Sequence, residues 1–413
     1  QKQGELMEVV APLVDISTGL SMVLGESRYL LLGANPSEMR LAGGMPLSAG
    51  ELHVQDGEFQ LLDVTPTHAL YPVDGGPVLD SDIADRWGFL SPTDDYRKLG
   101  YSARFAEWSG PQAIAMWERQ FGVDLDGVIQ VDPFLMEALL SVIGPVEVDG
   151  RLFDDSNITE YLLIGQYEEF ADIDYSVQDE RRDQLALVAL AVLREVGLRQ
   201  WDPTALADAL ATAGRGRHIL AYSDDPIQQQ AWEELGVAGR LEGDEAGVFL
   251  LNISAAKLDS FMDVDVDVVS SVGSEDSVGS DNRRQVTMAI EVSNRVPVDV
   301  SAQAAGLWEV IGLEDDGSYL GRLVVYAPAY AENLRFDDGR ALEVFGPDGQ
   351  VWVMGSRLEL DRGRSEVISV SFDIPAEIDY LDVVPSTRFP FQSWHVEATE
   401  YTDVEAFRLS LDR

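Results

Sequence analysis

Two different patterns of hydrophobic and polar residues divide the chain near residue 250. In the first part, short apolar runs typical of buried strands alternate with segments whose apolar residues recur at helical spacing. Strands and helices in alternation are typical of an α/β layer, so we predict an α/β domain over residues 1–250. The expected strands are 29–32, 51–59, 128–131, 146–148 and 217–222, and the expected helices are 5–25, 111–121, 133–143, 157–170, 183–196, 203–213 and 226–235.

The second part has strand patterns without intervening helices. Residues 270–281 are polar and rich in glycine and serine, and turn signals recur beyond them at the spacing of a β-sandwich. We therefore predict a connecting strand and polar linker over residues 251–283, followed by an all-β sandwich domain over residues 284–413. The expected strands of the sandwich are 285–292, 322–327, 341–345, 351–354, 366–374, 394–396 and 406–411.

Charge and composition exclude several classes of function. The chain carries 73 acidic and 29 basic residues, a net charge of −44, and nucleic-acid binding requires a basic surface. The absence of cysteine excludes disulfides, thiolate catalysis and cysteine-ligated zinc. No apolar run is long enough to span a bilayer, and the first residues resemble an amphipathic helix entered midway. A signal sequence or membrane anchor upstream of this chain fits that beginning.

Motifs of several common enzyme classes do not occur. The four histidines lie far apart in the sequence, without the close pairs of a zinc site, and no GxSxG, Walker-type or GxGxxG motif is present. The polar segment 273–281 offers Glu275, Asp276 and Asp281 to a calcium ion but lacks the spacing of a calcium loop. A solvated linker is the better interpretation of that segment.

The stretch from Tyr29 to Phe59 draws attention because a strand end is followed by a polar turn, a cation and two glycines. Asn35 and Glu38 lie in the turn, Arg40 follows, and Gly43–Gly44 permits backbone conformations that let a ligand approach closely. The simpler interpretation is a strand connection whose glycines only solve backbone geometry. Taken alone, this stretch favours the simpler interpretation.

Arginines and carboxylates form the remaining candidate constellation. Arginine binds phosphate oxygens in a bidentate manner, and a helix N-terminus adds partial positive charge. A divalent ion held between aspartates would compensate the negative charge of a pyrophosphate. The alternative is that the arginines are structural and pair with acids nearby. The candidates are Arg40, Asp63, Asp94, Asp95, Arg104, Arg181, Arg182 and Gln184.

The order of several motifs resembles an uncharacterised bacterial family that is common in actinobacteria and usually tethered by an N-terminal membrane helix. The motifs are LLLGANPSEMRLAGG, GVDLDGVIQVDP, LLSVIGPVEVDG, NITEYLL and RRDQLALVALAVL. The N-terminal half of that family is distantly similar to the LytR–CpsA–Psr enzymes, which transfer glycopolymers from polyprenyl-pyrophosphate carriers and have a mixed sheet with flanking helices. By this similarity, Arg40 matches their early arginine, and Arg181, Arg182 and Gln184 match their later cluster. Asp63 lies near their Arg-Asp pair, but this chain reads DVTPTH there and lacks the arginine.

The resemblance implies a phosphotransferase or pyrophosphatase that acts on a lipid-linked glycan outside the cell. Arg40, Arg181 and Arg182 would clamp the pyrophosphate, and Asp63 and Asp95 would hold Mg²⁺. The oligomeric state is left open. The expected substrate contacts are Asn35, Glu38, Gly43, Gly44, Arg104, Gln184, Trp87 and Tyr96.

Two other classes of protein fit the sequence. A glycoside hydrolase or transglycosylase requires two carboxylates, one with a raised pKa, and aromatic side chains to stack on sugars. The third class is a non-catalytic glycan-binding scaffold. For the glycosidase, the candidate carboxylates are Glu38, Glu51, Asp63, Asp94 and Asp95, and the candidate aromatics are Trp87, Tyr96, Tyr101 and Trp108.

Overall fold

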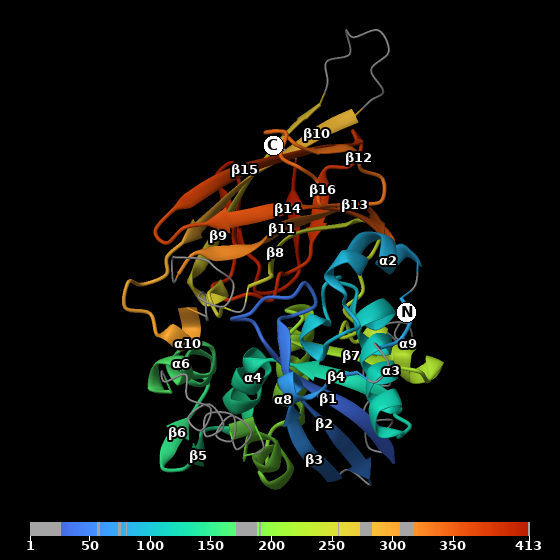
Figure 1. The fold of residues 1–413 in the computed structure, drawn as a ribbon, viewed down its shortest axis with the longest axis vertical. Coiled ribbons are helices and arrows are strands. Elements are labelled where there is room, and N and C mark those ends of the chain that lie inside the picture. Colours follow the sequence, from blue (N-terminus) through green and yellow to red (C-terminus); the bar gives the residue numbers. More distant parts are fainter. Residues whose placement is uncertain are drawn as a thin grey trace, which may run out of the picture.

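The computed structural model describes residues 26–55, 58–72, 76–79, 81–170, 188–189, 191–254, 256–272, 283–305 and 317–411. Within them the chain forms a mixed α/β layer, drawn in blue and green in Figure 1, and a strand-rich region drawn in yellow to red. This confirms the predicted order of an α/β part followed by a β-rich part. Among these residues, no helix has the length and apolar character needed to cross a membrane.

A five-stranded mixed sheet forms the middle of the α/β layer. Its strand order is β3-β2-β1-β4-β7. β1 pairs parallel with β4, and the other neighbours pair antiparallel, so the apolar run predicted at 29–32 lies in the central strand. The strands are β1 (Ser27–Asn35), β2 (Met45–Gln55), β3 (Glu58–Pro66), β4 (Gly127–Val131) and β7 (Ile219–Ser223).

Helices cover both faces of this sheet. On one face, α3 (Gly110–Phe121) places Ile114 and Trp117 in a core with Leu30 and Leu32 of β1. On the other face, Trp232 of α9 (Pro226–Glu234) packs against Tyr29. The other helices and the small hairpin of the layer are α2 (Ser81–Trp87), α4 (Pro133–Ile143), α5 (Ile158–Glu160), α6 (Gln166–Glu169), α8 (Pro203–Arg215), β5 (Val146–Val148) and β6 (Arg151–Phe153).

The helix α4 shows how local sequence sets an element. The carboxylate of Asp132 accepts hydrogen bonds from the backbone amides of Phe134 and Leu135 and so caps the helix, and Pro133 occupies the first turn. Gly144 ends the helix with φ of 78°. These signals explain why the predicted range 133–143 agrees with the structure.

The strand-rich region consists mainly of two six-stranded sheets. Their orders are β12-β15-β10-β9-β17-β18 and β13-β14-β11-β8-β16-β19. The strands of the first sheet are β9 (Met262–Val272), β10 (Arg283–Asn294), β12 (Glu332–Phe336), β15 (Ser365–Pro375), β17 (Ser393–Val396) and β18 (Thr399–Thr402). Those of the second are β8 (Glu245–Asn252), β11 (Tyr319–Ala327), β13 (Val344–Asp348), β14 (Val351–Leu360), β16 (Tyr380–Val383) and β19 (Phe407–Ser410). A short helix, α10 (Ala302–Ala305), lies beside α6 (Figure 1).

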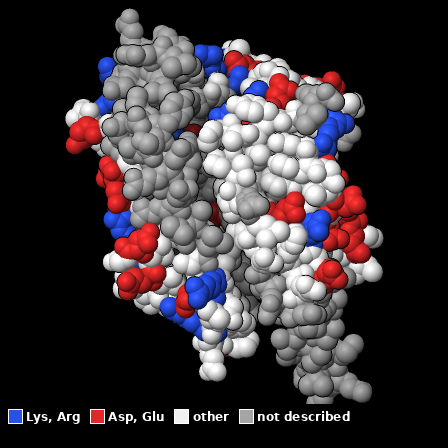
Figure 2. All heavy atoms as spheres, turned by 60° about the horizontal axis from the view of Figure 1, so that its bottom comes forward, with Lys and Arg blue, Asp and Glu red and all other residues white. Residues whose placement is uncertain are grey.

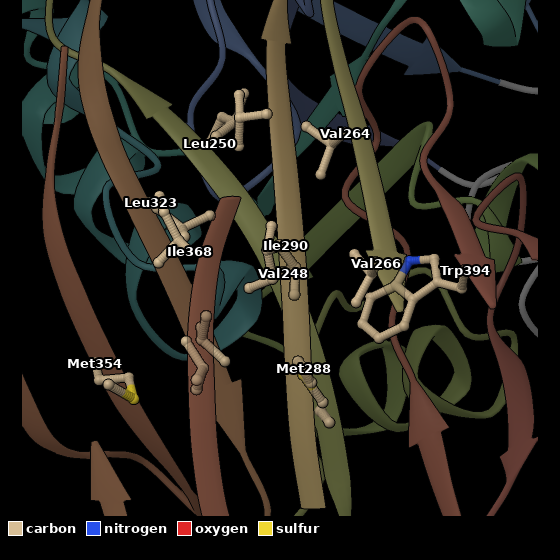
Figure 3. Packing of buried hydrophobic residues seen from close by; sticks show 14 of the residues in the cluster. Val248, Leu250, Val264, Val266, Met288, Ile290, Leu323, Met354, Ile368 and Trp394 are labelled. Carbon is tan, nitrogen blue, oxygen red and sulfur yellow. The ribbon is translucent and has the colours of Figure 1, made fainter. Parts of the chain in front are cut away.

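One hydrophobic core lies between these two sheets. Figure 3 shows Val248 and Leu250 of β8 together with Val264 and Val266 of β9, as well as Ile290 of β10. All of these side chains are buried, with at most 2% of each exposed. Burial of apolar surface from both sheets therefore holds the region together.

The two-sheet arrangement includes strands on both sides of residue 250. β8 begins at Glu245 and pairs with β11 and β16, and β9 pairs with β10 and β17. The sequence pattern assigned the start of β8 to the α/β part and gave residues 251–283 a connecting role. In the structure, β8 and β9 lie inside the two sheets. The expected linker ligands Glu275, Asp276 and Asp281 lie outside the described residues.

The stretch 77–105 contributes to the core. The sequence predicts an irregular, polar loop there, whereas the structure forms α2 and short turns at Gly88–Leu90 and Tyr96–Lys98, followed by a π-helical turn at Phe105–Ser109. Trp87, Tyr96 and Phe105 are completely buried. Aromatic side chains within this stretch fill the space between the sheet of the α/β layer, α3 and the strand-rich region.

Candidate functional site

The turn after β1 is closed by its own backbone and side chains. Asn35 Oδ1 accepts a hydrogen bond from the amide of Ser37 at 2.9 Å. Gly43 and Gly44 have φ of 87° and 91°, and a Cβ on Gly44 would lie 2.7 Å from the carbonyl carbon of Asn35. Only glycine tolerates both conditions, so backbone geometry alone explains the pair.

The guanidinium of Arg40 is engaged in hydrogen bonds within the protein. Its guanidinium donates hydrogen bonds to the carbonyl oxygens of Arg97 at 3.0 Å, Met39 at 2.9 Å and Asn252 at 2.6 Å, and only 4% of the residue is exposed. It lies 5.2 Å from the ring centre of Tyr101. The guanidinium of Arg40 is therefore not free to bind phosphate as expected. Instead, this arginine joins the turn to β8 of the strand-rich region.

Asn35 and Glu38 meet two residues that the sequence did not single out. Tyr167 accepts a hydrogen bond from Asn35 Nδ2 at 2.6 Å, and Glu38 Oε1 lies 3.4 Å from Lys257 Nζ. The ammonium of Lys257 lies 5.4 Å from the ring centre of Tyr167. Within the described part of the chain, Glu38 Oε2 is buried without a hydrogen-bond partner. We call these four residues the Glu38 cluster.

Asp95 is bound by a neighbour. It caps a short turn by accepting from the amide of Arg97 at 2.8 Å, and both of its oxygens lie 3.0 Å from Arg97 Nε. Magnesium coordination by Asp95 requires this ion pair to open, so the residue fits the expected role poorly. Asp63 lies in β3, and its side chain is outside what the structure describes. Among the described residues, no three acidic or histidine side chains gather as metal ligands.

Arg104 is also engaged in an internal network, centred on Asp348. Arg104 donates to Asp348 at 2.9 Å, to Asp82 at 3.0 Å and to Glu107 at 2.8 Å. These carboxylates raise the pKa of Arg104, against the opposing effect of its burial. Asp348 also accepts from Trp87 Nε1 at 3.3 Å. The network joins the α/β layer to β13, and the guanidinium of Arg104 is engaged by carboxylates of the protein itself.

The aromatic residues expected to stack on sugars lie in the core instead. Trp87 and Tyr96 are completely buried, Tyr101 is 6% exposed and Trp108 is 4% exposed. A ring face packed against protein atoms cannot receive a sugar ring. The reason is that this aromatic-rich stretch packs between the two parts of the molecule rather than over them.

The later arginine cluster lies outside the described residues. This applies to Arg181, Arg182 and Gln184, so their convergence with Arg40 stays a prediction. Asp94 lies 3.9 Å from Lys98, and Glu51 accepts from His53 and Trp117, so both carboxylates have partners at the surface of the α/β layer.

A separate groove lies where β8, β16 and β19 meet. Its volume is about 450 Å³, and it is open to solvent. Glu245 and Asp382 are direct partners on the parallel strands β8 and β16, so their side chains project from the same face. The groove is lined by Glu242, Asp244, Glu245, Asp382, Val383, Ala406, Phe407 and Arg408.

The two paired carboxylates have different surroundings. Burial raises the pKa of Glu245 to about 7, although nearby Arg217 and a hydrogen bond from the amide of Glu242 oppose the rise. Asp382 accepts two hydrogen bonds from Arg408, at 2.8 and 2.9 Å. Glu245 can therefore carry a proton near neutral pH.

One aromatic residue, Phe407, lines the groove, and others lie near its strands. Arg408 lies 3.9 Å from the ring centre of Tyr380, and Phe407 stacks on Tyr401 with ring centres 5.1 Å apart. Burial raises the pKa of Tyr330 to about 12, with further contributions from Asp244 and Asp382. Phe407 and Tyr401 pack against the core between the two sheets, so the lining of the groove is mainly acidic.

Sequence reasoning missed this groove. The adjacent acids in EGDE at residues 242–245 are a weak signal, since acidic residues are common throughout this chain. Asp382 lies far along the sequence, and only the parallel pairing of β16 with β8 brings it to Glu245. Figure 2 shows the same abundance on one face, where acidic side chains form several separate groups.

Asp259 is a buried acid at the junction between the two parts of the molecule. This buried carboxylate accepts from the amide of Met39 at 3.0 Å, from Asn252 at 2.7 Å and from Tyr319 at 2.9 Å, and burial raises its pKa from 3.8 to about 6. The folded state therefore binds this proton more tightly than the unfolded state. Its contribution to stability is complete below pH 3.8 and is lost as the pH rises through about 6.

We therefore expect Asp259→Asn to remove a pH-dependent part of the stability. Between pH 4 and 7, the difference in unfolding free energy between wild type and variant should shift progressively in favour of the variant. Urea unfolding at several pH values measures this difference. A constant difference over that range contradicts the assignment.

Residues 25–167 match the model of a family described as a protein of unknown function, DUF4012. This match confirms the predicted resemblance to an uncharacterised family over that range. No curated protein matches the chain. The matched range includes the turn after β1, the Asn35–Tyr167 contact and Asp95, whereas the groove at β8 and β16 lies beyond it.

Proposed function

We propose that the protein acts on a glycan of the cell envelope, and that it cleaves or transfers a glycosidic bond in the groove at β8, β16 and β19. The pairing of Glu245 with Asp382 carries this proposal, because two carboxylates, one of them with a raised pKa, project from the same face beside a space open to solvent. We place the protein at the cell surface, tethered through an anchor that lies outside this chain.

In the proposed reaction, the carboxyl group of Glu245 gives its proton to the bridging oxygen as the bond from that oxygen to the anomeric carbon breaks. Asp382 stabilises the positive charge that develops on the sugar ring. A water oxygen then bonds to the anomeric carbon, and the proton released by the water passes to Asp244, an exposed carboxylate in the same groove. In transfer, a sugar hydroxyl takes the place of the water.

Glu245→Gln is expected to lower turnover of a cleaved envelope glycan by about 10²–10⁴-fold, since the amide has no proton to donate. Asp382→Asn should also lower turnover. Glu377→Gln, which changes an exposed carboxylate elsewhere, should not. Release of reducing ends from a panel of envelope glycans measures the effect. Absence of cleavage across the panel, together with retained glycan binding, indicates a non-catalytic scaffold instead.

The same assignment predicts the pH dependence of turnover. Because the pKa of Glu245 is raised to about 7, its acid form decreases as the pH rises through that value. We therefore expect kcat/KM to fall on the alkaline side of pH 7. A profile of kcat/KM that stays flat from pH 6 to pH 8 contradicts the role of Glu245 as the acid.

Phosphotransfer on a polyprenyl-pyrophosphate-linked glycopolymer is our second proposal. It rests on the resemblance of Arg181, Arg182 and Gln184 to the later cluster of the LytR–CpsA–Psr enzymes, because the guanidinium of Arg40 is engaged by backbone carbonyl oxygens. Arg181→Ala is the informative variant, because Arg40→Ala also removes contacts that hold the turn. Loss of turnover on a lipid-pyrophosphate glycan in Arg181→Ala and after EDTA treatment supports this proposal, and activity that survives both removes it.

A further inference from the structure

A lysine and a glutamate of the Glu38 cluster form a buried pair between the two parts of the molecule. Nζ of Lys257 lies 3.4 Å from Oε1 of Glu38, and the two side chains are 11% and 5% exposed. The buried ring of Tyr167 lies beside the amine, with its centre 5.4 Å from Nζ. Glu38 belongs to the turn after β1, whereas Lys257 follows β8, so the pair connects the α/β layer to the strand-rich region.

The carboxylate of this pair is incompletely compensated. In the part of the chain that the structure describes, Oε2 of Glu38 is buried without a hydrogen-bond partner. A guanidinium binds both oxygens of a carboxylate, and arginine supplies nearly all the basic residues of this chain, with Lys2, Lys98 and Lys257 as its lysines. A primary amine therefore stands at a buried position where an arginine would satisfy the carboxylate better.

We propose that Lys257 and Glu38 condense to an amide that cross-links the two parts of the molecule. A proton passes from Nζ to Oε2, which leaves a neutral amine beside a neutral acid. Nζ then bonds to Cδ of Glu38, the bond from Cδ to Oε2 breaks, and Oε2 leaves as water with a second proton from Nζ. The step is a dehydration, so it requires neither an oxidant nor a further reactant.

Burial favours the amide over the separated charges. In water, hydration of the ammonium and the carboxylate opposes condensation, whereas this pair has lost most of its hydration. The amide is neutral, and its formation removes the oxygen that has no hydrogen-bond partner. Well-oriented groups within one molecule also react as if at a concentration of about 10⁵ M.

Mass spectrometry of the intact, denatured chain tests the proposal. We expect the wild type to be lighter than its sequence by the mass of one water. Lys257→Arg keeps the positive charge without the amine, and Glu38→Ala removes the acid, so both variants should have their full mass. Lys98→Arg is the matched control, because Lys98 is part-exposed and lies near Asp94, and it should keep the loss of water.

Trypsin locates the bond, because it cleaves after arginine and after free lysine. The cross-link should abolish cleavage after Lys257 and join peptide 29–40 to peptide 241–283. A wild type of full mass that is cleaved after Lys257 overturns the proposal. A bond from Lys257 to another acid, such as Glu168 beside the same small cavity, also overturns it. These outcomes are independent of the proposed glycosidase, since neither Glu38 nor Lys257 lines the groove.

Discussion

Replacing Asp348 with alanine is expected to lower the free energy of unfolding by about 3–5 kcal/mol. Only 1% of Asp348 is exposed, and its two oxygens accept from Arg104, Trp87, Ser102 and Tyr326. Alanine leaves all four donors facing a small cavity. Glu107 and Asp82 still pair with Arg104, so the main loss concerns the uncharged donors and the packing around them.

The urea midpoint, monitored by tryptophan fluorescence, measures this loss. Asp299→Ala is the matched control, because Asp299 is exposed and a surface substitution of this kind changes stability by only about 0.5 kcal/mol or less. Since Asp348 joins the α/β layer to the strand-rich region, we also expect the variant to unfold over a broader range of urea. Equal midpoints for the two variants contradict the importance of this network.

Salt is expected to have the second large effect. The chain carries a net charge of −44, and repulsion among like charges destabilises a compact state. From about 0.01 M to about 1 M salt, the distance over which charges act falls from about 30 Å to about 3 Å. We expect the melting temperature to rise by roughly 5–10 °C over this range, which for a chain of this size corresponds to a gain of several kcal/mol.

Potassium chloride should be compared with sucrose, because sucrose favours the folded state without screening charge. Acidic neighbours on β9 show the origin of the effect, since Asp263 and Asp267 contribute to the raised pKa of Asp265, after its burial. If potassium chloride gives no larger rise in melting temperature than sucrose, charge repulsion is not what limits stability.

The sequence was sufficient for elements with strong local signals. The range of α4 follows from the cap at Asp132, Pro133 and Gly144, all of which act within a few residues. β9 was harder to recognise as a sheet strand, because its alternating valines and aspartates also fit a polar connection. Its role depends on β10 and β17, and such pairing is set by contacts that lie far apart in the sequence.

The candidate site could be predicted only in part. The turn after β1 does bring Asn35 and Glu38 to one buried cluster, but Tyr167 and Lys257 join them through tertiary packing. The sequence predicts that Trp87 and Tyr96 contact the substrate, because their stretch is rich in aromatic residues and lacks periodicity. In the structure both side chains are buried, because the stretch fills a junction between two layers. The partner of Glu245 depends on strand register, which local sequence does not encode.

The position of β8 and β9 bears on how the gene can be divided for expression. A fragment that starts at residue 284 would lack β8, which joins β11 to β16, and β9, which joins β10 to β17. Each sheet would then fall into two halves with unprotected edges, and such edges promote aggregation. A fragment that starts before Glu245 keeps both sheets whole, although it exposes the surface that the α/β layer covers.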